Sequence, residues 1–337
     1  MHWTLPNRDA VVGAANPQFR RDGVRAPALP ASLRDPLPTG SRPTGQCPVE
    51  MVDSIDDRSS SVQESHAAKR PETNRFNQGE ENPVKISGNT IFIPGSTSGI
   101  GLALALALHA RGNTVVIGGR RREELDRIAT EHPELGAVTI DTTDPDSIRR
   151  AAAQVQAEYP DLNVLIAMAG IMRMEDWHHP DTFLDTATTT VETNLLGPIR
   201  LIAAFIEHLQ KQPDSTIVTV SSGLAFAPLQ VTPTYNASKA AIHMLGESIR
   251  LQLADTSVKV LELVPPSVRT GLMPGQETND AAMPLDEFVA EVMALIEAEP
   301  ETHEILVDRV KFLRYGEARG DYDDVVARLN AADPHGK

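Results

Sequence analysis

The sequence predicts a doubly wound α/β domain with a mostly parallel, seven-stranded sheet and helices on both faces. Short β-branched runs alternate with helical ones from about residue 86 onward, beginning with NTIFIP, GLALALALHARG and TVVIG. The strand runs are apolar at nearly every position, which is typical of a parallel sheet covered on both sides. Between the first strand and the first helix lies GSTSGIG (95–101), where folds of this class bind nucleotides.

The same alternation continues along the chain. Strand patterns are expected at 137–141, 163–170, 215–222 and 258–266, and helical patterns at 122–132, 145–159, up to about Gln210, and from about Thr234 to Ala254. The run LALALALHA has the period of a strand, but leucine and alanine both favour helix, so we expect a buried helix there. Seven strands in about 245 residues leave no room for a second large domain.

The chain divides into two regions with different sequence patterns. Residues 1–85 are rich in proline and lack a sustained apolar period, so we expect a disordered extension. Met51 lies within it, and translation starting there is an alternative. Residues 86–337 form the predicted domain, including a substrate loop at 269–284 and a C-terminal helical tail.

Composition excludes several classes of function. A net charge of −15 argues against nucleic-acid binding, and the single Cys47 excludes an intrachain disulfide and a cysteine-based metal site. No apolar run reaches the roughly 18 residues of a membrane span, and the first residues lack a signal peptide's apolar stretch, so we expect a cytoplasmic protein without membrane contact. We also expect no metal site, because the adjacent His178 and His179 do not converge on one ion without further ligands.

The glycine loop suits a phosphate group at a helix N-terminus. Gly95 would allow a tight turn, Gly99 would let a pyrophosphate approach the backbone, and Gly101 would let the helix pack on the strand. Taken alone, the loop is equally compatible with a glycine turn before a core helix. No Lys-Ser/Thr pair follows the glycines, which excludes a P-loop.

The end of the second strand favours NADP(H) over NAD(H). Where an acidic residue would bind the ribose 2′-hydroxyl, the sequence has Gly118 and Gly119. Arg120, Arg121 and Arg122 follow and suit a 2′-phosphate. The alternative is an exposed first helical turn. Because cations are unfavourable at a helix N-terminus, a bound anion explains the cluster better.

Candidate chemistry lies in SSGLAFAPLQVTPTYNASK. Tyr235 and Lys239 are four residues apart on a predicted helix and therefore share one face. A neighbouring ammonium is expected to lower the pKa of the Tyr235 phenol, which would make it a general acid or base for a carbonyl or alcohol. Ser222 ends a strand and could hydrogen-bond the substrate oxygen.

These motifs together resemble the short-chain dehydrogenase/reductase family. The loop GSTSGIG, Ser222, the segment YNASK and Asn194 in TNLLGP match its single-domain branch of about 250 residues in order and spacing. The resemblance implies a catalytic tetrad of Asn194, Ser222, Tyr235 and Lys239. In it, Lys239 also binds the nicotinamide ribose, and Asn194 holds a water that relays protons from Lys239. The tail EILVDRVKFLRYGEARGDYDDVVARLN is similar to DltE-like bacterial oxidoreductases of the same family.

A cofactor site follows from the loop, the arginines and the resemblance. Its candidate residues are Gly95, Thr97, Ser98, Gly99, Ile100, Gly101, Arg120, Arg121, Asp141, Ala169, Gly170, Tyr235, Lys239, Pro265, Val268 and Thr270. The resemblance places Asp141 at the adenine ring and the last three residues beside the nicotinamide. The alternative for the region around Asp141 is a helix cap at Asp144.

Three positions depart from the family pattern. Pro94 replaces the threonine before the first glycine and removes a hydroxyl and a backbone N–H, while Ala167 and Met168 replace paired asparagines. The family positions brace the loop over the adenosine, so cofactor geometry or stability is expected to change.

The leading hypothesis is an NADP(H)-dependent oxidoreductase that interconverts a small carbonyl compound and a secondary alcohol. An NADP(H)-binding sensor or scaffold without turnover is the alternative from another class. Sugar-nucleotide epimerase chemistry is disfavoured, because the residues after Pro266 supply too small a substrate domain. The resemblance also suggests a homodimer or homotetramer built on the helices before Gln210 and after Thr234.

Overall fold

A single parallel sheet organises the computed structural model, which describes residues 85–331. The strands are β1 (Thr90–Pro94), β2 (Thr114–Gly119), β3 (Gly136–Thr139), β4 (Val164–Ala167), β5 (Ser215–Val220), β6 (Val258–Leu263) and β7 (Glu304–Ile305). Their order is β3-β2-β1-β4-β5-β6-β7, and every neighbouring pair is parallel. The predicted doubly wound sheet is confirmed.

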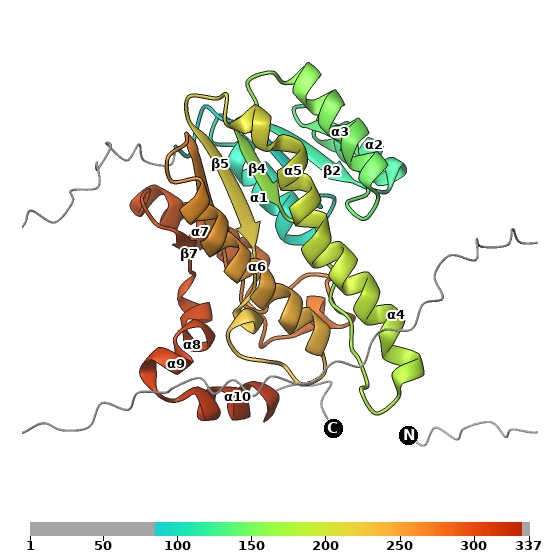
Figure 1. Ribbon diagram of the computed structural model, residues 1–337, viewed down its shortest axis with the longest axis vertical. Coiled ribbons are helices and arrows are strands. Elements are labelled where there is room, and N and C mark those ends of the chain that lie inside the picture. Colours follow the sequence, from blue (N-terminus) through green and yellow to red (C-terminus); the bar gives the residue numbers. More distant parts are fainter. Residues whose placement is uncertain (1–84, 332–337) are drawn as a thin grey trace, which may run out of the picture. The chain divides into compact units, whose positions relative to one another are not determined.

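Helices connect consecutive strands (Figure 1). The α-helices are α1 (Gly99–His109), α2 (Arg122–Glu131), α3 (Pro145–Glu158), α4 (Pro180–Val191), α5 (Gly197–Leu209), α6 (Pro233–Gln252), α7 (Leu285–Ala298), α8 (Lys311–Arg314), α9 (Gly316–Arg319) and α10 (Tyr322–Ala331). Short 3₁₀ turns are η2 (Gly223–Ala225), η3 (Gln276–Thr278) and η4 (Asp308–Val310), and η1 (Glu192–Leu196) is a π-helical turn.

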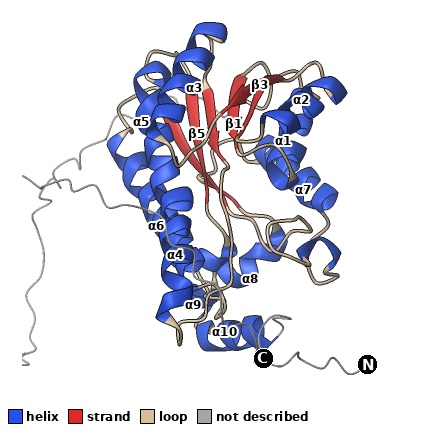
Figure 2. Ribbon diagram, turned by 90° about the vertical axis from the view of Figure 1, so that its right-hand side faces the viewer, coloured by secondary structure: helices blue, strands red, loops and turns tan. Residues whose placement is uncertain are grey.

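The sheet lies between two helical layers, with α1 and α7 on one side and α3, α5 and α6 on the other (Figure 2). Alternate residues of β1 enter opposite cores because successive strand side chains point to opposite faces. Ile91 and Ile93 pack in the cluster that contains Leu104 of α1. Phe92 packs in the other cluster, where its ring centroid lies 5.5 Å from that of Phe205 in α5.

The strand order places a topological switch point between β1 and β4. From β1 the chain proceeds to β2 and β3 on one side, and from β4 it proceeds to β5, β6 and β7 on the other. In open α/β sheets the crevice at the carboxyl ends of such strands is where ligands bind. The loops after β1, β4 and β5 all open there, and they carry the glycine loop, Ala169, Gly170 and Ser222.

Most predicted helices are confirmed, including a helical LALALALHA in α1 and the helix after Thr234 as α6. The predicted long helix ending near Gln210 is interrupted: α4 passes through the π-helical η1 before α5 begins. Such π-turns within helices frequently occur at functional sites, and this one carries Asn194. The predicted disordered extension lies outside the described residues.

The C-terminal helices pack against the segment that joins Ser222 to Tyr235. A Cβ at Gly223 would lie 2.7 Å from Leu313 of α8, so the two elements are in close contact. Asn330 of α10 accepts a hydrogen bond from the Gln230 amide at 2.7 Å. The tail thus braces the loop that leads into α6. Among residues 85–331, no helix is long and apolar enough to cross a bilayer.

Candidate active site

One cavity of about 1050 Å³ opens at the carboxyl ends of β1, β4 and β5. The predicted catalytic and cofactor residues that line it are Gly95, Thr97, Ser98, Gly99, Ile100, Gly101, Arg120, Arg121, Asp141, Ala169, Gly170, Ser222, Tyr235, Lys239, Pro265, Val268 and Thr270. Segments separated by more than a hundred residues therefore share a single site. Asn194 is the predicted residue that lies behind the lining.

The glycine loop is packed so tightly that side chains would not fit. Gly95 has a φ of 91°, and a Cβ there would lie 2.5 Å from the backbone of Ala169 after β4. A Cβ at Gly101 would lie 2.6 Å from the Gly95 carbonyl oxygen. The predicted roles of these two glycines, a tight turn and close helix packing, agree with these contacts.

The N-terminus of α1 lacks a capping side chain. Ser98 occupies the N-cap position in an extended conformation, but its side chain accepts no hydrogen bond from the first turn. The backbone N–H groups at this end have no partner within the helix. Since Ser98, Gly99 and Ile100 line the cavity, an anion held there would meet free donors and the positive end of the helix dipole.

The Pro94 substitution is accommodated by its neighbour. Gly95 and Ser96 both donate backbone hydrogen bonds to the Gly118 carbonyl oxygen, at 2.8 and 3.1 Å. The buried Ser96 hydroxyl also accepts from the Gly118 amide at 3.2 Å and donates to the Ile93 carbonyl. A hydroxyl one residue beyond the first glycine thus braces the loop against β2.

The arginine cluster divides into two parts. Arg122 forms an ion pair with Asp126 one turn along α2, at 2.9 Å. Arg120 and Arg121 are exposed and line the cavity, and their side chains have no ion pair or hydrogen bond among residues 85–331. Two guanidinium groups therefore remain open toward the cavity.

Asp141 also lines the cavity, and one of its carboxylate oxygens already accepts hydrogen bonds within the protein. Its Oδ1 accepts hydrogen bonds from the Thr143 amide at 2.9 Å and the Thr143 hydroxyl at 2.7 Å. The capping role considered for Asp144 is also present, because that side chain accepts from the Asp146 amide and caps α3. Asp141 therefore both shapes a turn and lines the cavity.

The catalytic candidates meet at the opposite end. Ser222, at the end of β5, and Tyr235 and Lys239, one turn apart on α6, are 7%, 6% and 6% exposed. Lys239 Nζ lies 5.6 Å from the centroid of the Tyr235 ring and donates a hydrogen bond to the Val220 carbonyl oxygen at 2.8 Å. The phenol and the ammonium are thus adjacent and buried at the cavity wall.

Burial reverses the expected effect on the phenol. The sequence predicts a lowered pKa for Tyr235, but burial raises its pKa to about 12, and the Ser222 hydroxyl counters part of that rise. Burial also lowers the pKa of Lys239 to about 8, against the opposing pull of Glu262. In the protein alone, burial is therefore the dominant influence on both pKa values.

Asn194 lies behind the cavity lining and links the segment after β4 to α6. Its Oδ1 accepts from the Ile171 amide at 2.8 Å, and its Nδ2 donates to the Ile171 carbonyl at 2.9 Å. Nδ2 also lies 3.2 Å from the Ser238 hydroxyl of α6. A Cβ added to Gly170 would lie 3.5 Å from Asn194 Oδ1 and 3.6 Å from Lys239 Nζ. The side chain is therefore near Lys239, with its amide occupied by the segment after β4.

Comparison with known proteins identifies the family. The short chain dehydrogenase family profile matches residues 89–281. The uncharacterized oxidoreductase DltE of Bacillus subtilis (strain 168) is 36% identical over 256 residues, which cover 74% of this chain and all of that protein. The chain belongs to the short-chain dehydrogenase family. It is an oxidoreductase of that family, and the predicted likeness to DltE-like proteins is confirmed.

Solved short-chain dehydrogenases have the same architecture. The enzyme from Burkholderia cenocepacia J2315, whose crystal structure is in complex with NADP, is 26% identical with a TM-score of 0.61, covering 73% of this chain and 99% of that one. The protein from Streptomyces avermitilis is 25% identical with a TM-score of 0.61, covering 72% and 96%.

In this short-chain dehydrogenase, further side chains line the cavity beside the predicted residues. They include Met172, Arg173, Met174, Leu272, Met273 and Glu277. The predicted substrate loop contains Leu272, Met273 and Glu277, whereas Arg173 and Met174 were not predicted, because residues in such loops carry no distinctive pattern. Trp177 stacks on Phe183 at 4.5 Å and lies outside the lining.

The predicted substrate loop (269–284) is closed at its base. Val268 forms a parallel bridge with Met283, and the Arg269 amide donates to the Met283 carbonyl at 2.8 Å. Gln276 reaches back to the Val268 carbonyl oxygen at 2.7 Å. The loop is thus an anchored unit, and its residues from Thr270 to Glu277, apart from Gly275, line the cavity.

Sequence reasoning also missed a buried acid–base pair behind Lys239. Glu262 in β6 is fully buried and accepts a hydrogen bond from His243 Nδ1 of α6 at 2.8 Å. A single glutamate within the apolar run VLELVPP was the available signal.

Proposed function

We propose that this short-chain dehydrogenase is an NADP(H)-dependent oxidoreductase that interconverts a small carbonyl compound and a secondary alcohol. The observation that carries the proposal is the shared cavity. It joins an uncapped helix N-terminus and two open guanidinium groups to a buried serine, tyrosine and lysine. A cofactor end and a proton-transfer end thus face one enclosed volume.

The residues at the cofactor end fit a dinucleotide phosphate. Ser98, Gly99 and Ile100 line the cavity at the uncapped N-terminus of α1, where a diphosphate would meet free backbone N–H groups. Arg120 and Arg121 would bind a 2′-phosphate, which favours NADP(H) over NAD(H). When bound, the nicotinamide supplies or accepts the hydride.

The catalytic end would handle the proton. With a pKa of about 12, Tyr235 is protonated at neutral pH and suited to donate its proton to a carbonyl oxygen during reduction. Ser222 would hydrogen-bond the same oxygen as charge develops on it. Lys239, with a pKa of about 8, would stabilise the resulting phenolate as an ammonium ion.

A carbonyl-substrate panel monitored by NADPH absorbance tests the proposal. Turnover of at least one ketone is expected in the native protein, with a loss of about 10³-fold in Tyr235→Phe. NADPH affinity should remain within about threefold, because the phenol oxygen is not needed to bind the diphosphate. NADPH binding with no turnover across a broad panel would instead support the non-catalytic sensor.

We also propose a homo-oligomer formed through α5 and α6. Apolar side chains on these helices are exposed, among them Ile199 (39%), Met244 (62%) and Leu251 (81%). Large apolar side chains exposed on long helices would be covered if the helices formed a subunit interface. Light scattering after size exclusion should give a dimer or tetramer mass, and Leu251→Glu should shift it toward the monomer.

A further inference from the structure

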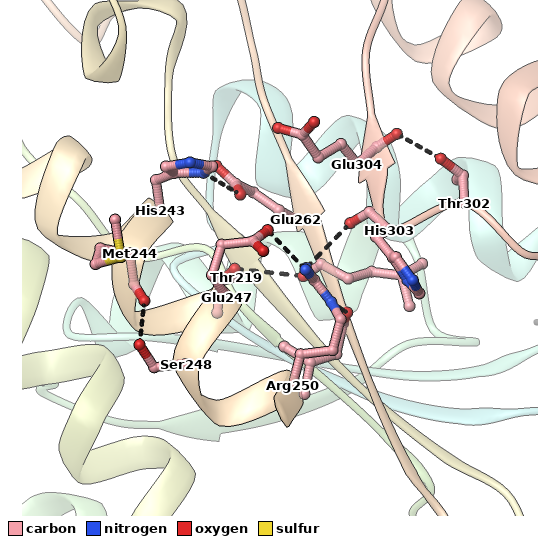
Figure 3. Close-up of polar contacts among 12 residues, drawn as sticks. Thr219, His243, Met244, Glu247, Ser248, Arg250, Glu262, Thr302, His303 and Glu304 are labelled. Carbon is pink, nitrogen blue, oxygen red and sulfur yellow. Dashed lines mark hydrogen bonds and ion pairs between the residues drawn. The ribbon is translucent and has the colours of Figure 1, made fainter. Parts of the chain in front are cut away.

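Polar side chains line the sheet-facing side of α6. Lys239, His243 and Glu247 follow one another at four-residue spacing, so they lie on one face of the helix. Lys239 Nζ donates to the Val220 carbonyl oxygen of β5 at 2.8 Å, and His243 Nδ1 donates to Glu262 Oε2 of β6 at 2.8 Å. In Figure 3, His243 of α6 points at the Glu262 carboxylate. Two successive turns of α6 thus make polar contacts with adjacent strands.

The strand register places Glu262 close to the Lys239 contact. In the β5–β6 pairing, Val220 lies opposite Leu263, and Thr219 lies opposite Glu262. The residue whose carbonyl binds Lys239 is therefore one position from the partner of Glu262. Consistent with this placement, the Glu262 carboxylate raises the pKa of Lys239 against the larger lowering effect of burial.

Glu262 is an unusual residue for its position. It is 0% exposed, and its Oε1 has no hydrogen-bond partner among the described residues. Burying a carboxylate is costly unless a nearby cation compensates it. An apolar residue would satisfy the packing of β6, so the carboxylate calls for a local electrostatic explanation.

The neighbouring carboxylates each have their own guanidinium partner. Glu247 accepts from Arg250 of the same helix at 2.6 Å. Glu304 of β7, which pairs in register with Glu262, accepts from Arg314 of α8 at 2.8 and 3.1 Å.

Two further charged residues near Glu262, His303 and Lys259, interact with other carboxylates. His303, just before β7, is exposed, and its charge contributes to the lowered pKa of Glu247. Lys259 of β6 pairs with Asp214, at 3.4 Å. Arg314, although paired with Glu304, is also close enough for the Glu262 charge to raise its pKa. Besides this shared guanidinium, His243 and Lys239 are the groups placed to balance the buried carboxylate.

We propose that Glu262, oriented by His243, is a positioning residue that keeps Lys239 protonated beside Tyr235. The inference rests on the proposed function, in which Lys239 acts as an ammonium ion. Glu262 touches neither the cavity nor the reacting atoms and acts through Lys239. The Glu262 carboxylate supplies a fixed negative charge near Lys239. Without that charge, burial alone would favour the neutral amine of Lys239.

A metal site is the competing explanation of the same cluster. His243, Glu247 and Glu262 each offer a ligand atom, and these atoms lie within 4.8 Å of one another. Arg250 already supplies a cation to Glu247, and Figure 3 shows its guanidinium directed at that carboxylate. The structure therefore favours a protein-supplied charge balance over a bound metal ion.

The direct test is an NMR titration of Lys239 in the full chain labelled with [ε-¹³C]lysine, without cofactor or substrate. The Lys239 signal is assigned by its absence in Lys239→Arg. We expect a pKa of about 8 in the native protein. Glu262→Gln, which preserves size, should lower that pKa by about 1 unit because the opposing negative charge is gone. An unchanged Lys239 pKa in this variant overturns the proposal.

Matched variants separate the specific effect from general ones. Glu247→Gln makes the same chemical change one turn from His243 and should leave the Lys239 pKa in place. His243→Phe, which removes the donor to Glu262, should give a smaller shift in the direction of Glu262→Gln, and His243→Gln, which retains an N–H donor, should restore the native value. An equal shift in Glu247→Gln contradicts the account, and so does an unchanged pKa in His243→Phe.

Two further measurements distinguish the alternatives. If EDTA raises the Lys239 pKa in the native protein and added Zn²⁺ lowers it again, a metal ion occupies the cluster and balances Glu262, and the proposal is wrong. In turnover assays, the alkaline limb of kcat/KM should move to lower pH in Glu262→Gln by the same amount as in the titration. Because the NMR titration needs no turnover, it stands or falls separately from the proposed reaction.

Discussion

The two ends of the cavity differ in which parts of the chain form them. The cofactor end consists mainly of backbone, with glycines that admit no side chain, an uncapped helix N-terminus and two exposed arginines, Arg120 and Arg121. At the catalytic end, Ser222, Tyr235 and Lys239 are each at most 7% exposed and hydrogen-bond or pack within the fold. Binding is therefore assigned to donors that solvent reaches, and proton transfer to groups whose pKa values are set by burial.

This difference teaches where each property of the enzyme can be changed. Under the proposed function, changes to the backbone donors and surface arginines would alter cofactor affinity and leave the buried chemistry unchanged. Buried ionisable groups, in contrast, alter the chemistry through the local dielectric environment and neighbouring charges. Lys239 links the two ends, because the family resemblance assigns it to the nicotinamide ribose while its ammonium faces Tyr235.

The largest expected effect is at Lys239, the shared residue. Lys239→Met should lower turnover by about 10³-fold and weaken NADPH binding by about tenfold, since both a charge beside the phenol and a cofactor contact are lost. Steady-state kinetics and fluorescence titration with NADPH measure the two effects. Lys259→Met, which removes a lysine outside the cavity, should change neither value. An unaltered turnover in Lys239→Met would separate this residue from the chemistry.

The second-largest effect is expected at the glycine loop, where a substitution should lower the stability of the protein. Gly95→Ala should lower the free energy of unfolding by about 3 kcal/mol, because it combines a left-handed φ with a clash against the Ala169 backbone. Gly112→Ala is the matched control at the other end of α1. Its φ is 83°, but nothing lies within 4 Å of the added Cβ, so about 1 kcal/mol is expected. Equal losses in urea denaturation would show that packing of the loop against Ala169 has no special cost.

A smaller effect is expected at the arginines. Arg121→Ala should weaken NADPH binding by about tenfold and leave NADH binding nearly unchanged, because only the former carries the 2′-phosphate. Arg122→Ala removes the arginine that pairs with Asp126 and should have little effect on either cofactor. Competitive titrations with both cofactors provide the comparison. A loss of NADH affinity equal to that of NADPH would place Arg121 elsewhere on the dinucleotide.

The smallest effect is a pH dependence of the catalytic end. Below about pH 8 Lys239 is an ammonium ion, and as pH rises through that pKa the ion loses its proton while Tyr235, with a pKa of about 12, keeps its own. Reductive kcat/KM should therefore fall above about pH 8. A profile from pH 6 to 10 measures it, and a rate that rises across this range would contradict the assignment of the cation to catalysis.

Local sequence patterns predicted most of the fold and most of the cavity lining. Periodicity located the strands and helices, and the glycine loop and the Tyr235–Lys239 spacing each lie within one segment. The pairing of Glu262 with His243 depends on how α6 lies across β6, which no local pattern specifies. For the same reason the sequence suggested a lowered pKa for Tyr235, since the spacing of two residues reveals their proximity but not their burial.

The most direct test of the central claim is a crystal structure of the Tyr235→Phe protein with NADPH. We expect the diphosphate within hydrogen-bond distance of the N–H groups at Ser98–Gly101, the 2′-phosphate beside Arg120 or Arg121, and the nicotinamide next to residue 235 and Lys239. A cofactor bound outside this cavity, or with its nicotinamide turned away from α6, would contradict the account.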